Sequence, residues 1–316
     1  MDVLITEELV SPAIDRLGKT YSIVSEPTLW KDPSSLKAKI TDARALMIRN
    51  QTRVTDDLLA AAPALKAVGR VGVGLDNIDL SAAKKRGVVV IAPLNANAVS
   101  VAELTLGLIL ALARKVPAGD RSTRSGQWDR KTFTGIELEG KTLGICGLGR
   151  IGRLVAQRAK AFGMKLVVYD PFLKADSPAL GGLDAVLFET LHQALGGADF
   201  VTVHSPLTPE TRHLFNERTF GAMKRGSFFI NTSRGGVMNE TALLHALKTG
   251  YLAGAALDVR EIEPPNSRDG FESLDNVILT PHIGAFTGEA QARTFEAVCD
   301  DLDRVLRGEA PQNAVS

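Results

Sequence analysis

The chain has 316 residues, of which 45% are hydrophobic and 23% are charged, and its formal net charge is +1. This composition is typical of a globular protein and excludes a disordered or fibrous one. The near-neutral charge gives no electrostatic reason to expect nucleic acid or an anionic membrane as a partner. The length favours two domains, because a single hydrophobic core usually stops growing below about 300 residues.

The N-terminal residues 1–10 lack the basic stretch and apolar run of a signal peptide, so we expect none. The most apolar window, 104–113, is too short for a bilayer span of about 20 residues, and we expect a buried helix there. Cys146 and Cys299 have no CxxC spacing. We therefore expect no disulfide, no metal site and a reducing, cytoplasmic location.

In chain order, short apolar runs alternate with longer helical patterns. The first part of the chain predicts a helix at 55–61 and strands at 3–6, 46–48, 67–71 and 88–91. A polar segment at 92–100 then precedes a strongly apolar helix at 101–115. The second part predicts helices at 151–162, 240–247 and 287–307, and strands at 142–146, 165–169, 200–204, 228–231, 254–258 and 277–280.

Continuous apolar strands separated by helices predict parallel sheets that are covered by helices on both faces, hence an α/β fold. We expect two Rossmann-like domains with parallel sheets rather than one very wide sheet. One domain is predicted to comprise 1–95 and 283–316, because the amphipathic tail should return to the first sheet. The other domain, 96–282, is predicted to be inserted into it.

The strongest local motif is GLGRIG, from Gly147 to Gly152, which follows a predicted strand and opens a predicted helix. Gly147 permits the tight turn, Gly149 lets a diphosphate approach the backbone, and Gly152 allows close packing of helix on strand. The N–H groups at Arg150 and Ile151 then hold the diphosphate at the positive end of the helix dipole. Taken alone, the motif also fits a glycine-rich turn of any α/β fold.

The next predicted strand narrows these alternatives. It leads into Asp170, eighteen residues after Gly152. A carboxylate at this position accepts hydrogen bonds from the adenosine ribose hydroxyls and repels a 2′-phosphate. Asp170 could instead be a turn residue before Pro171, but its place after the glycine motif predicts a site for NAD rather than NADP.

Longer stretches of the chain resemble the D-isomer-specific 2-hydroxyacid dehydrogenases and, within that family, the D-3-phosphoglycerate dehydrogenases. The likeness covers nearly the whole chain and is strongest in GRVGVGLDNIDL (69–80), GQWDRKTFTGIELEGKTLGI (126–145) and FGMKLVVYDP (162–171). With this resemblance, the inserted domain is expected to bind NAD and the discontinuous, flavodoxin-like domain to bind a small hydroxy or keto acid. A homodimer is also expected.

The resemblance implies the catalytic residues position by position. Arg234, in NTSRGG, matches the arginine that binds the carboxylate and the C2 oxygen of the substrate. Glu263, in DVREIEP, matches the glutamate that pairs with the catalytic histidine, and His282, in TPHIG, matches that histidine. Each of the three alone would also fit an ordinary loop or strand end. Together, at family positions, they favour catalysis.

These residue types suit the removal of a hydride from C2 and of a proton from its hydroxyl. Histidine is the side chain that gains and loses a proton near neutral pH. An adjacent carboxylate favours the imidazolium and orients the ring, and an arginine grips a carboxylate at two points. Arg234 and His282 follow predicted strands, at the carboxyl ends where parallel α/β sheets bind ligands.

The resemblance also implies cofactor and substrate contacts. Asp258 is expected near the nicotinamide carboxamide, and the other cofactor residues are His204, Pro206, Thr208, Thr232, Ser233 and Gly284. The backbone of Val73 and Gly74 is expected to receive the substrate carboxylate, and Arg49 to face the distal substrate group. Asn97 fits an asparagine of the family and completes the expected substrate set.

Some positions depart from the family pattern. Leu94 and Ala96 stand where proline and glycine are common, Arg260 replaces a frequent phenylalanine, and Met238-Asn239 replaces a valine–aspartate pair. The catalytic set is unchanged by these departures. The sequence ends where longer relatives continue into a regulatory domain, so we expect a short form without serine feedback through such a domain.

The remaining histidines and one tryptophan receive other interpretations. His192, His213 and His245 have no matching partner and are expected to be structural or surface residues. Trp128 lies in an arm-like segment, and it is expected either to pack across a dimer interface or to be buried within its own chain.

The leading hypothesis is NAD-dependent oxidation of 3-phosphoglycerate to 3-phosphohydroxypyruvate, a step of serine biosynthesis. A glyoxylate or hydroxypyruvate reductase would use the same catalytic residues, whereas a formate dehydrogenase would not require Glu263. An NAD-sensing binding protein is the alternative from another class. Turnover with NAD separates that alternative from an enzyme.

Overall fold

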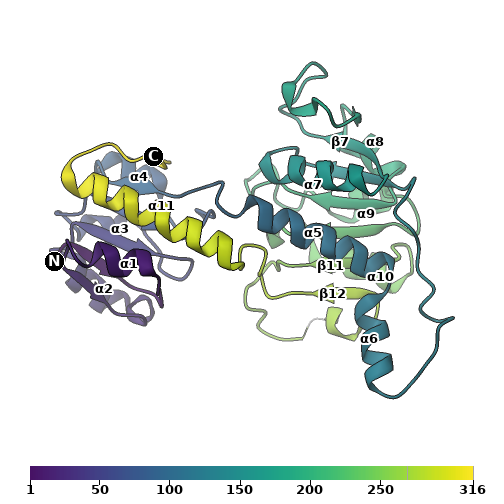
Figure 1. Cartoon of the computed structure of the whole chain (residues 1–316), viewed down its shortest axis with the longest axis horizontal. Coiled ribbons are helices and arrows are strands. Elements are labelled where there is room, and N and C mark those ends of the chain that lie inside the picture. Colours follow the sequence, from purple (N-terminus) through teal and green to yellow (C-terminus); the bar gives the residue numbers. More distant parts are fainter. Residues whose placement is uncertain (269, 316) are drawn as a thin grey trace. The chain divides into compact units, whose positions relative to one another are not determined.

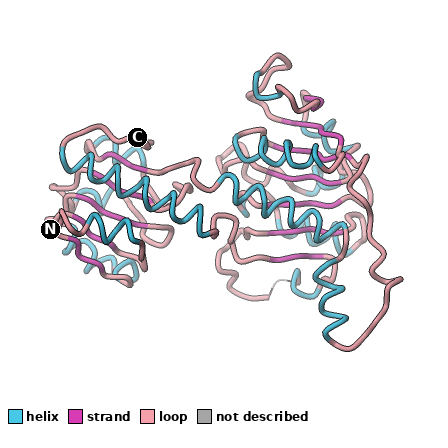
Figure 2. Tube along the Cα trace, viewed as in Figure 1, coloured by secondary structure: helices cyan, strands magenta, loops and turns pink. Residues whose placement is uncertain are grey.

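The computed structural model describes residues 1–268 and 270–315 and divides the chain into two compact units (Figures 1 and 2). Unit 1 combines Met1–Asn97 with the segment from Ala285 to the C-terminus, and unit 2 is Ala98–Gly284. The domain predicted at 1–95 and 283–316 includes residue 316, which lies outside the described residues. The chain therefore leaves unit 1 once, builds unit 2 and returns.

Unit 1 is built on a five-stranded sheet with the order β2-β1-β3-β4-β5, and all of its pairings are parallel. This order is that of flavodoxin-like sheets. The strands are β1 (Val3–Ile5), β2 (Ile23–Ser25), β3 (Ala45–Ile48), β4 (Ala67–Arg70) and β5 (Val89–Ile91). The helices are α1 (Pro12–Leu17), α2 (Pro33–Ile40), α3 (Asp56–Ala60), α4 (Leu80–Lys85) and α11 (Gly288–Arg307), with a 3₁₀ turn η1 (Leu29–Lys31).

The helix α11 is an integral part of unit 1. Its buried residues Val298 and Leu302 lie in one apolar core with residues of β1, β3 and α1. A Cβ atom on Gly69 of β4 would lie 2.8 Å from Val298 Cγ1 and 3.0 Å from Leu302 Cδ1. The close packing of the helix on the sheet therefore requires a glycine at this position.

Unit 2 is built on a seven-stranded parallel sheet with the order β12-β11-β10-β9-β6-β7-β8. The strands are β6 (Thr142–Cys146), β7 (Lys165–Tyr169), β8 (Ala185–Leu187), β9 (Phe200–Val203), β10 (Phe228–Asn231), β11 (Gly254–Leu257) and β12 (Val277–Leu279). The helices are α5 (Ala98–Ala113), α6 (Val116–Arg124), α7 (Arg150–Ala161), α8 (Leu191–Gly196), α9 (Glu217–Ala222) and α10 (Glu240–Lys248). The 3₁₀ turns are η2 (Pro178–Leu180), η3 (Gly235–Val237) and η4 (Phe271–Ser273).

Helices cover both faces of this sheet. One apolar cluster joins α5 and α7 to Leu143 and Ile145 of β6, and α5 lies beside α7 (Figure 1). A second cluster joins α8, α9 and α10 to Cys146 of β6 and to Val201 and Val203 of β9. Neighbouring residues of one strand thus point into different cores, as expected for a sheet buried on both sides. The predicted α/β class is confirmed.

The sheet of unit 2 has a topological switch point, because β6 lies between β7 and β9 and the chain adds strands in opposite directions from it. Parallel α/β sheets bind ligands beyond the carboxyl ends of the strands at such a point. In unit 1 the corresponding point lies between β1 and β3.

Several predicted bounds are wrong. The predictions missed β2 and β8, which are three-residue strands at the sheet edges. The apolar helix begins at Ala98 instead of 101, because Ala98 and Ser100 are buried and tertiary packing extends the first turn across a polar residue. Among the described residues, no helix is long and apolar enough to cross a membrane.

Candidate active site

The glycine motif forms a tight turn between β6 and α7. Gly147 has a φ of +91°, a conformation that glycine adopts without strain. A Cβ atom on Gly147 would lie 3.1 Å from the backbone of His204, and one on Gly152 would lie 2.2 Å from the carbonyl oxygen of Gly147. These two glycines therefore allow the turn and the helix to pack closely on the strands.

Gly149 differs from its two neighbours in the motif. A Cβ atom built on Gly149 would meet nothing within 4 Å, so its missing side chain leaves open space. Gly149 is also the N-cap of α7, and it has no side chain to accept hydrogen bonds from the first N–H groups of the helix, those of Arg150 and Ile151 among them. Open space at the positive end of a helix dipole is where a diphosphate binds, so the turn fits a dinucleotide.

Asp170 follows β7 and braces the glycine turn. Its Oδ2 accepts a hydrogen bond from the N–H of Leu148 at 2.9 Å, and its Oδ1 accepts one from the N–H of Phe172 at 3.0 Å. A carboxylate has about four acceptor positions, so two remain for ribose hydroxyls. The half-buried Asp170 thus combines support of the turn with the chemistry of an adenosine ribose site.

His204 follows β9 and lies directly beside the glycine turn. Its Nε2 lies 3.1 Å from the hydroxyl of Thr202, and burial lowers the pKa of His204 to about 3. The ring is therefore neutral at physiological pH and does not suit proton transfer there. In the loop that follows, the hydroxyl of Thr211 donates to the carbonyl of Pro206 at 2.6 Å and accepts from the N–H of Thr208 at 2.8 Å.

Asn231, at the end of β10, shapes the turn that carries Arg234. Its buried side chain accepts hydrogen bonds from the N–H and the hydroxyl of Ser233, at 2.9 and 2.8 Å, and donates to the carbonyl of Arg234 at 2.9 Å. Thr232 shares a hydrogen bond of 2.9 Å with Thr105 of α5. Asn231 was not among the residues predicted for the site, although asparagine is favoured where a turn begins.

His282 and Glu263 form a hydrogen-bonded pair. The Nδ1 atom of His282 lies 2.6 Å from Oε2 of Glu263, and the two side chains are 44% and 35% exposed. Burial raises the pKa of Glu263. Hydrogen bonds from His282 and from the N–H of Arg260, together with the charges of His282 and Arg234, lower the pKa. The lowering is the larger effect, so the pKa lies below its ordinary value. Glu263 is therefore a carboxylate that accepts from Nδ1, which leaves Nε2 of His282 available for proton transfer.

Asp258 holds residues on both sides of His282. Its carboxylate is 1% exposed and accepts hydrogen bonds from the hydroxyl of Thr280 at 2.6 Å and from the N–H groups of Ile283 and Gly284, each at 2.8 Å. His282 itself has a φ of +54°, which is unusual for a residue with a side chain. The Asp258 hydrogen bonds hold the chain in this conformation.

In unit 1, Arg49 follows β3 at the switch point of the sheet. Its Nη2 donates to Oε1 of Gln291 at 2.9 Å, and its guanidinium lies 4.3 Å from the ring centre of Phe286. The half-buried guanidinium is therefore held by an amide and an aromatic ring. Burial lowers the pKa of Arg49, against the charge of Glu7, but the group stays protonated at any physiological pH.

Glu7, which follows β1, is a residue that the sequence analysis missed. Its side chain is 3% exposed. It accepts hydrogen bonds from four consecutive N–H groups, those of Arg49, Asn50, Gln51 and Thr52, at 2.9 to 3.2 Å. An acidic residue directly after the first buried strand was the available signal. The carboxylate fixes the loop that begins with Arg49.

The other expected substrate residues also lie in unit 1. Val73 and Gly74 follow β4, and among the described residues 1–268 and 270–315 their N–H groups have no hydrogen-bond acceptor. Such donors suit an incoming carboxylate. Asn97 is 6% exposed and is the last residue of the first segment of unit 1. The predicted site residues are thus distributed over both units.

His213 and Trp128 lie outside the candidate site, and the structure shows the surroundings of each side chain. His213 has a partner, because its Nε2 lies 3.2 Å from Oε2 of Glu261. The partner comes from a segment 48 residues further along, which the sequence pattern could not indicate. Trp128 is 80% exposed, so it is not buried within its own chain.

In the described part of the chain, no group of three His, Cys, Asp or Glu residues could hold a metal ion.

Comparisons with known proteins agree with this geometry. Residues 106–284 match the sequence profile of the D-isomer specific 2-hydroxyacid dehydrogenase, NAD binding domain. The chain is 45% identical over 314 residues to a D-3-phosphoglycerate dehydrogenase of Methanocaldococcus jannaschii. The aligned region covers 99% of this chain and 59% of that protein. The chain thus spans about three fifths of the length of that relative.

Solved structures of similar proteins cover the chain completely or nearly so. A protein of Thermus thermophilus superimposes with a TM-score of 0.92 at 36% identity, over 100% of both chains. A D-lactate dehydrogenase of Aquifex aeolicus, complexed with NAD and lactic acid, has a TM-score of 0.88 at 31% identity, over 99% of both chains. The chain belongs to the D-isomer specific 2-hydroxyacid dehydrogenase family, and residues 106–284 are its NAD binding domain.

Proposed function

We propose that this protein is an NAD-dependent oxidoreductase that oxidises D-3-phosphoglycerate at C2 to 3-phosphohydroxypyruvate, and catalyses the reverse reaction. The observation that carries the reaction type is the 2.6 Å hydrogen bond between His282 and Glu263, within a domain of an NAD-binding dehydrogenase family. The substrate is supported by the identity to D-3-phosphoglycerate dehydrogenases and by the half-buried guanidinium of Arg49.

In the oxidation, His282 acts as the base. Its Nε2 accepts the proton of the C2 hydroxyl, and the carboxylate of Glu263 stabilises the imidazolium that results. Arg234 binds the substrate carboxylate and the C2 oxygen and favours the negative charge that develops on that oxygen. NAD, when bound, would supply the acceptor for the hydride of C2. In the reverse reaction the imidazolium of His282 returns the proton to the oxygen.

The residues of unit 2 that follow its strands hold the cofactor in this proposal. Gly149, with the N–H groups of Arg150 and Ile151, binds the diphosphate, and Asp170 accepts from the adenosine ribose. The neutral ring of His204, with Pro206 and Thr208 in the same loop, covers the cofactor. The other cofactor contacts come from Thr232, Ser233, Asp258 and Gly284.

The residues of unit 1 recognise the anionic groups of the substrate in this proposal. The N–H groups of Val73 and Gly74 receive the carboxylate, and Asn97 contributes to the same recognition. Arg49 pairs with the distal phosphate, because a guanidinium matches the geometry of phosphate oxygens.

The decisive experiment measures initial rates with NAD and with NADP for a panel of D-2-hydroxy acids and 2-keto acids. We expect the highest kcat/KM for D-3-phosphoglycerate with NAD. A higher value for glycolate or D-glycerate would replace the substrate assignment and favour a glyoxylate or hydroxypyruvate reductase. NAD binding without turnover of any acid would favour an NAD-sensing protein.

Cofactor choice is tested by Asp170→Ala. Loss of a charged acceptor is expected to weaken NAD binding by a factor of about 10 to 100 and to reduce discrimination against NADP. The matched control is Asp176→Ala, which removes an exposed acid from the loop after the same strand. Equal use of both cofactors by the unaltered protein would contradict the role of Asp170.

We also propose a homodimer and a cytoplasmic location. Support for the dimer comes from exposed apolar side chains on α6 and in the following arm, Val116 at 55% and Trp128 at 80%. Support for a reducing compartment comes from the free thiols of Cys146 and Cys299. Sedimentation of the unaltered protein and of Trp128→Ser tests the dimer, and a monomeric unaltered protein would contradict it. Cell fractionation tests the location.

A further inference from the structure

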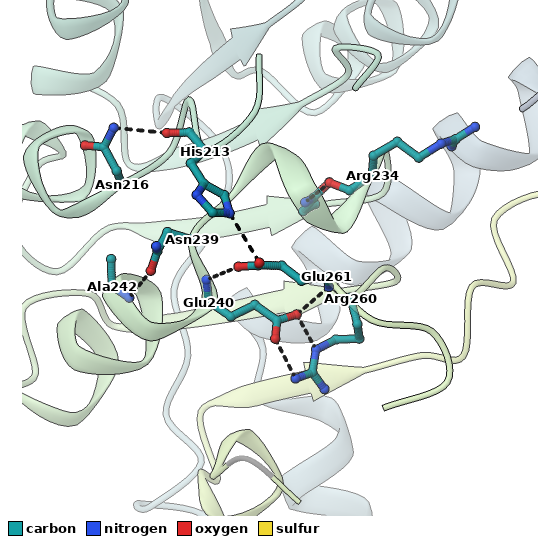
Figure 3. A network of polar contacts seen from close by, with 9 residues as sticks. His213, Asn216, Arg234, Asn239, Glu240, Ala242, Arg260 and Glu261 are labelled. Carbon is teal, nitrogen blue, oxygen red and sulfur yellow. Dashed lines mark hydrogen bonds and ion pairs between the residues drawn. The ribbon is translucent and has the colours of Figure 1, made fainter. Parts of the chain in front are cut away.

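A cluster of polar side chains lies in unit 2 beside the segment that carries Glu263 (Figure 3). It consists of His213, Glu240, Arg260 and Glu261, and we call it the anchor cluster. Residues 258–263, which carry Glu263, follow β11 and belong to no helix or strand. Hydrogen bonds to side chains therefore contribute to fixing the position of this segment, beside the one from the N–H of Asp258 to the carbonyl of Asn231.

The strongest contact of the anchor cluster joins Glu240 to Arg260. The Nε of Arg260 donates to Oε1 of Glu240 at 2.8 Å, and its Nη2 donates to Oε2 at 3.1 Å. The two side chains are only 9% and 19% exposed, and the guanidinium lies 5.0 Å from the ring centre of Phe271. A bidentate pair that is shielded from water fixes orientation as well as distance.

Glu240 and Glu261 also exchange hydrogen bonds, each from a backbone N–H group to the side-chain carboxylate of the other residue. The N–H of Glu261 donates to Oε1 of Glu240, and the N–H of Glu240 donates to Oε1 of Glu261, each at 2.8 Å. The Nε2 atom of His213 lies 3.2 Å from Oε2 of Glu261. The irregular segment is thus attached to the first turn of α10, as the dashed lines of Figure 3 show.

The anchor cluster connects two segments that carry proposed catalytic residues. The N–H of Arg260 donates to Oε1 of Glu263 at 2.9 Å. On the other side, a Cβ atom on Gly235 would lie 1.9 Å from the carbonyl oxygen of Arg260, so the turn after Arg234 packs directly on the backbone of this segment. The N–H of His213 also donates to the carbonyl of Gly236 at 2.9 Å. Figure 3 shows the guanidinium of Arg234 pointing away from the cluster.

We propose that Glu240 and Arg260 are positioning residues, which fix the N–H of Arg260 beneath the carboxylate of Glu263 and thereby hold that carboxylate against His282. This inference rests on the proposed function for its kinetic consequence, but not for its structural one. The charged groups that face Glu263 are His282 and Arg234, and neither is altered by changes at Glu240 or Arg260.

The experiment uses the variants Arg260→Met and Glu240→Gln, each as the full chain. The first measurement is the NMR titration of His282 in the protein without cofactor, which is practicable because the chain has five histidines. Release of Glu263 removes a stabilising partner of the imidazolium, so the titration midpoint of His282 should fall by about half to one pH unit. The second measurement is kcat/KM against pH, whose acid limb should move to lower pH by a similar amount.

Three comparisons make the result specific. Arg158→Met removes an arginine that pairs with Glu103 at 3.5 Å elsewhere in unit 2, and it should leave the midpoint unchanged. In a Glu263→Gln background, Arg260→Met should cause no further shift, because the carboxylate that it positions is absent. Thermal unfolding separates loss of fold from loss of position, and Glu240→Gln keeps the shape of the side chain.

An unchanged His282 midpoint in folded Arg260→Met and Glu240→Gln would overturn the positioning role, whatever the rates. A shift that persists in the Glu263→Gln background would also overturn it, because the cluster would then act on His282 by another route. If the unaltered protein oxidises none of the acids, the proposed function fails while the NMR titration still decides this inference.

Discussion

The N–H of Gly284 donates a hydrogen bond of 2.8 Å to the carboxylate of Asp258, a residue that lies 26 positions earlier in the chain. Together with the bonds from Thr280 and Ile283, this bond fixes both ends of the short segment that carries His282. The resemblance had assigned Asp258 to the nicotinamide. Its geometry adds a second task, the support of His282, the proposed catalytic histidine, in a backbone conformation with positive φ.

Asp258→Asn should therefore destabilise the protein and slow catalysis. The amide group supplies one acceptor oxygen where the carboxylate supplied two, so one of the buried donors loses its partner. We expect a loss of about 1–3 kcal/mol in the free energy of unfolding, measured by denaturant titration. Asp275→Asn, at a side chain that is 99% exposed, is the control. Equal stability of the two variants would contradict the bracing role.

Glu263→Gln tests the proposed acid–base mechanism. The carboxylate is the anionic partner that favours the imidazolium of His282, and the amide removes this charge while keeping the shape. Oxidation needs neutral His282, so the acid limb of its kcat/KM profile should move to lower pH. Reduction needs the imidazolium, so its activity should fade at lower pH than in the unaltered protein. The rates should also fall by a factor of about 100 or more.

Both shifts must have the same direction, because one ionisation governs both directions of the reaction. The profiles have to be recorded under conditions in which proton and hydride transfer limit the rate. Unchanged limbs in both directions would remove Glu263 from the proposed role.

Two alanine substitutions in the glycine turn should have different effects, one on stability and the other on NAD binding. A Cβ atom on Gly152 would lie 2.2 Å from the carbonyl of Gly147, so Gly152→Ala should destabilise unit 2 by about 1–3 kcal/mol. A Cβ atom on Gly149 points into open space, so Gly149→Ala should fold normally and lose NAD affinity. Calorimetry of NAD binding and thermal unfolding measure the two effects. Unchanged NAD affinity in Gly149→Ala would contradict the diphosphate assignment.

Glu7→Gln should affect substrate binding more than the rate of the chemical step. The amide oxygen replaces only one of two acceptors, so the four N–H groups of the Arg49 loop cannot all be satisfied. We expect the KM for D-3-phosphoglycerate to rise by a factor of about 10 or more, with a smaller change in kcat. Glu8→Gln, at the exposed neighbouring position, is the control. An equal KM in both variants would show that Glu7 does not control the loop.

Much of the fold follows from local sequence patterns. The strands of unit 2 that are four or five residues long were predicted to within one residue, because a largely apolar run is enough to indicate a parallel strand. The edge strands β2 and β8 were missed, because their three residues are strands only through pairing with β1 and β7. Residues such as His204 and Asp258 were included in strands although they follow the last paired position.

The residues of the candidate site were less accessible to sequence patterns. The expected partner of His282 came from the family resemblance, and spacing alone would not have indicated it. Glu7, Asn231 and the anchor cluster were missed because each side chain acts on backbone groups that only the tertiary fold brings near. Glu7, for example, meets N–H groups 42 to 45 residues away. The sequence around a polar residue beside a strand does not indicate which distant backbone groups its side chain will bind.

The helix α11 has a consequence for biosynthesis. Its residues Phe295, Val298 and Leu302 bury Val3 and Ile5 of the first strand, yet the ribosome makes them only after the whole of unit 2. The contiguous unit 2 can therefore fold while residues 1–97 still wait for their last helix. During that interval the apolar residues of the first sheet that α11 covers have, among the described helices, only α1 on that face. We therefore expect unit 2 to complete its fold before unit 1, although the synthesis of unit 1 begins first.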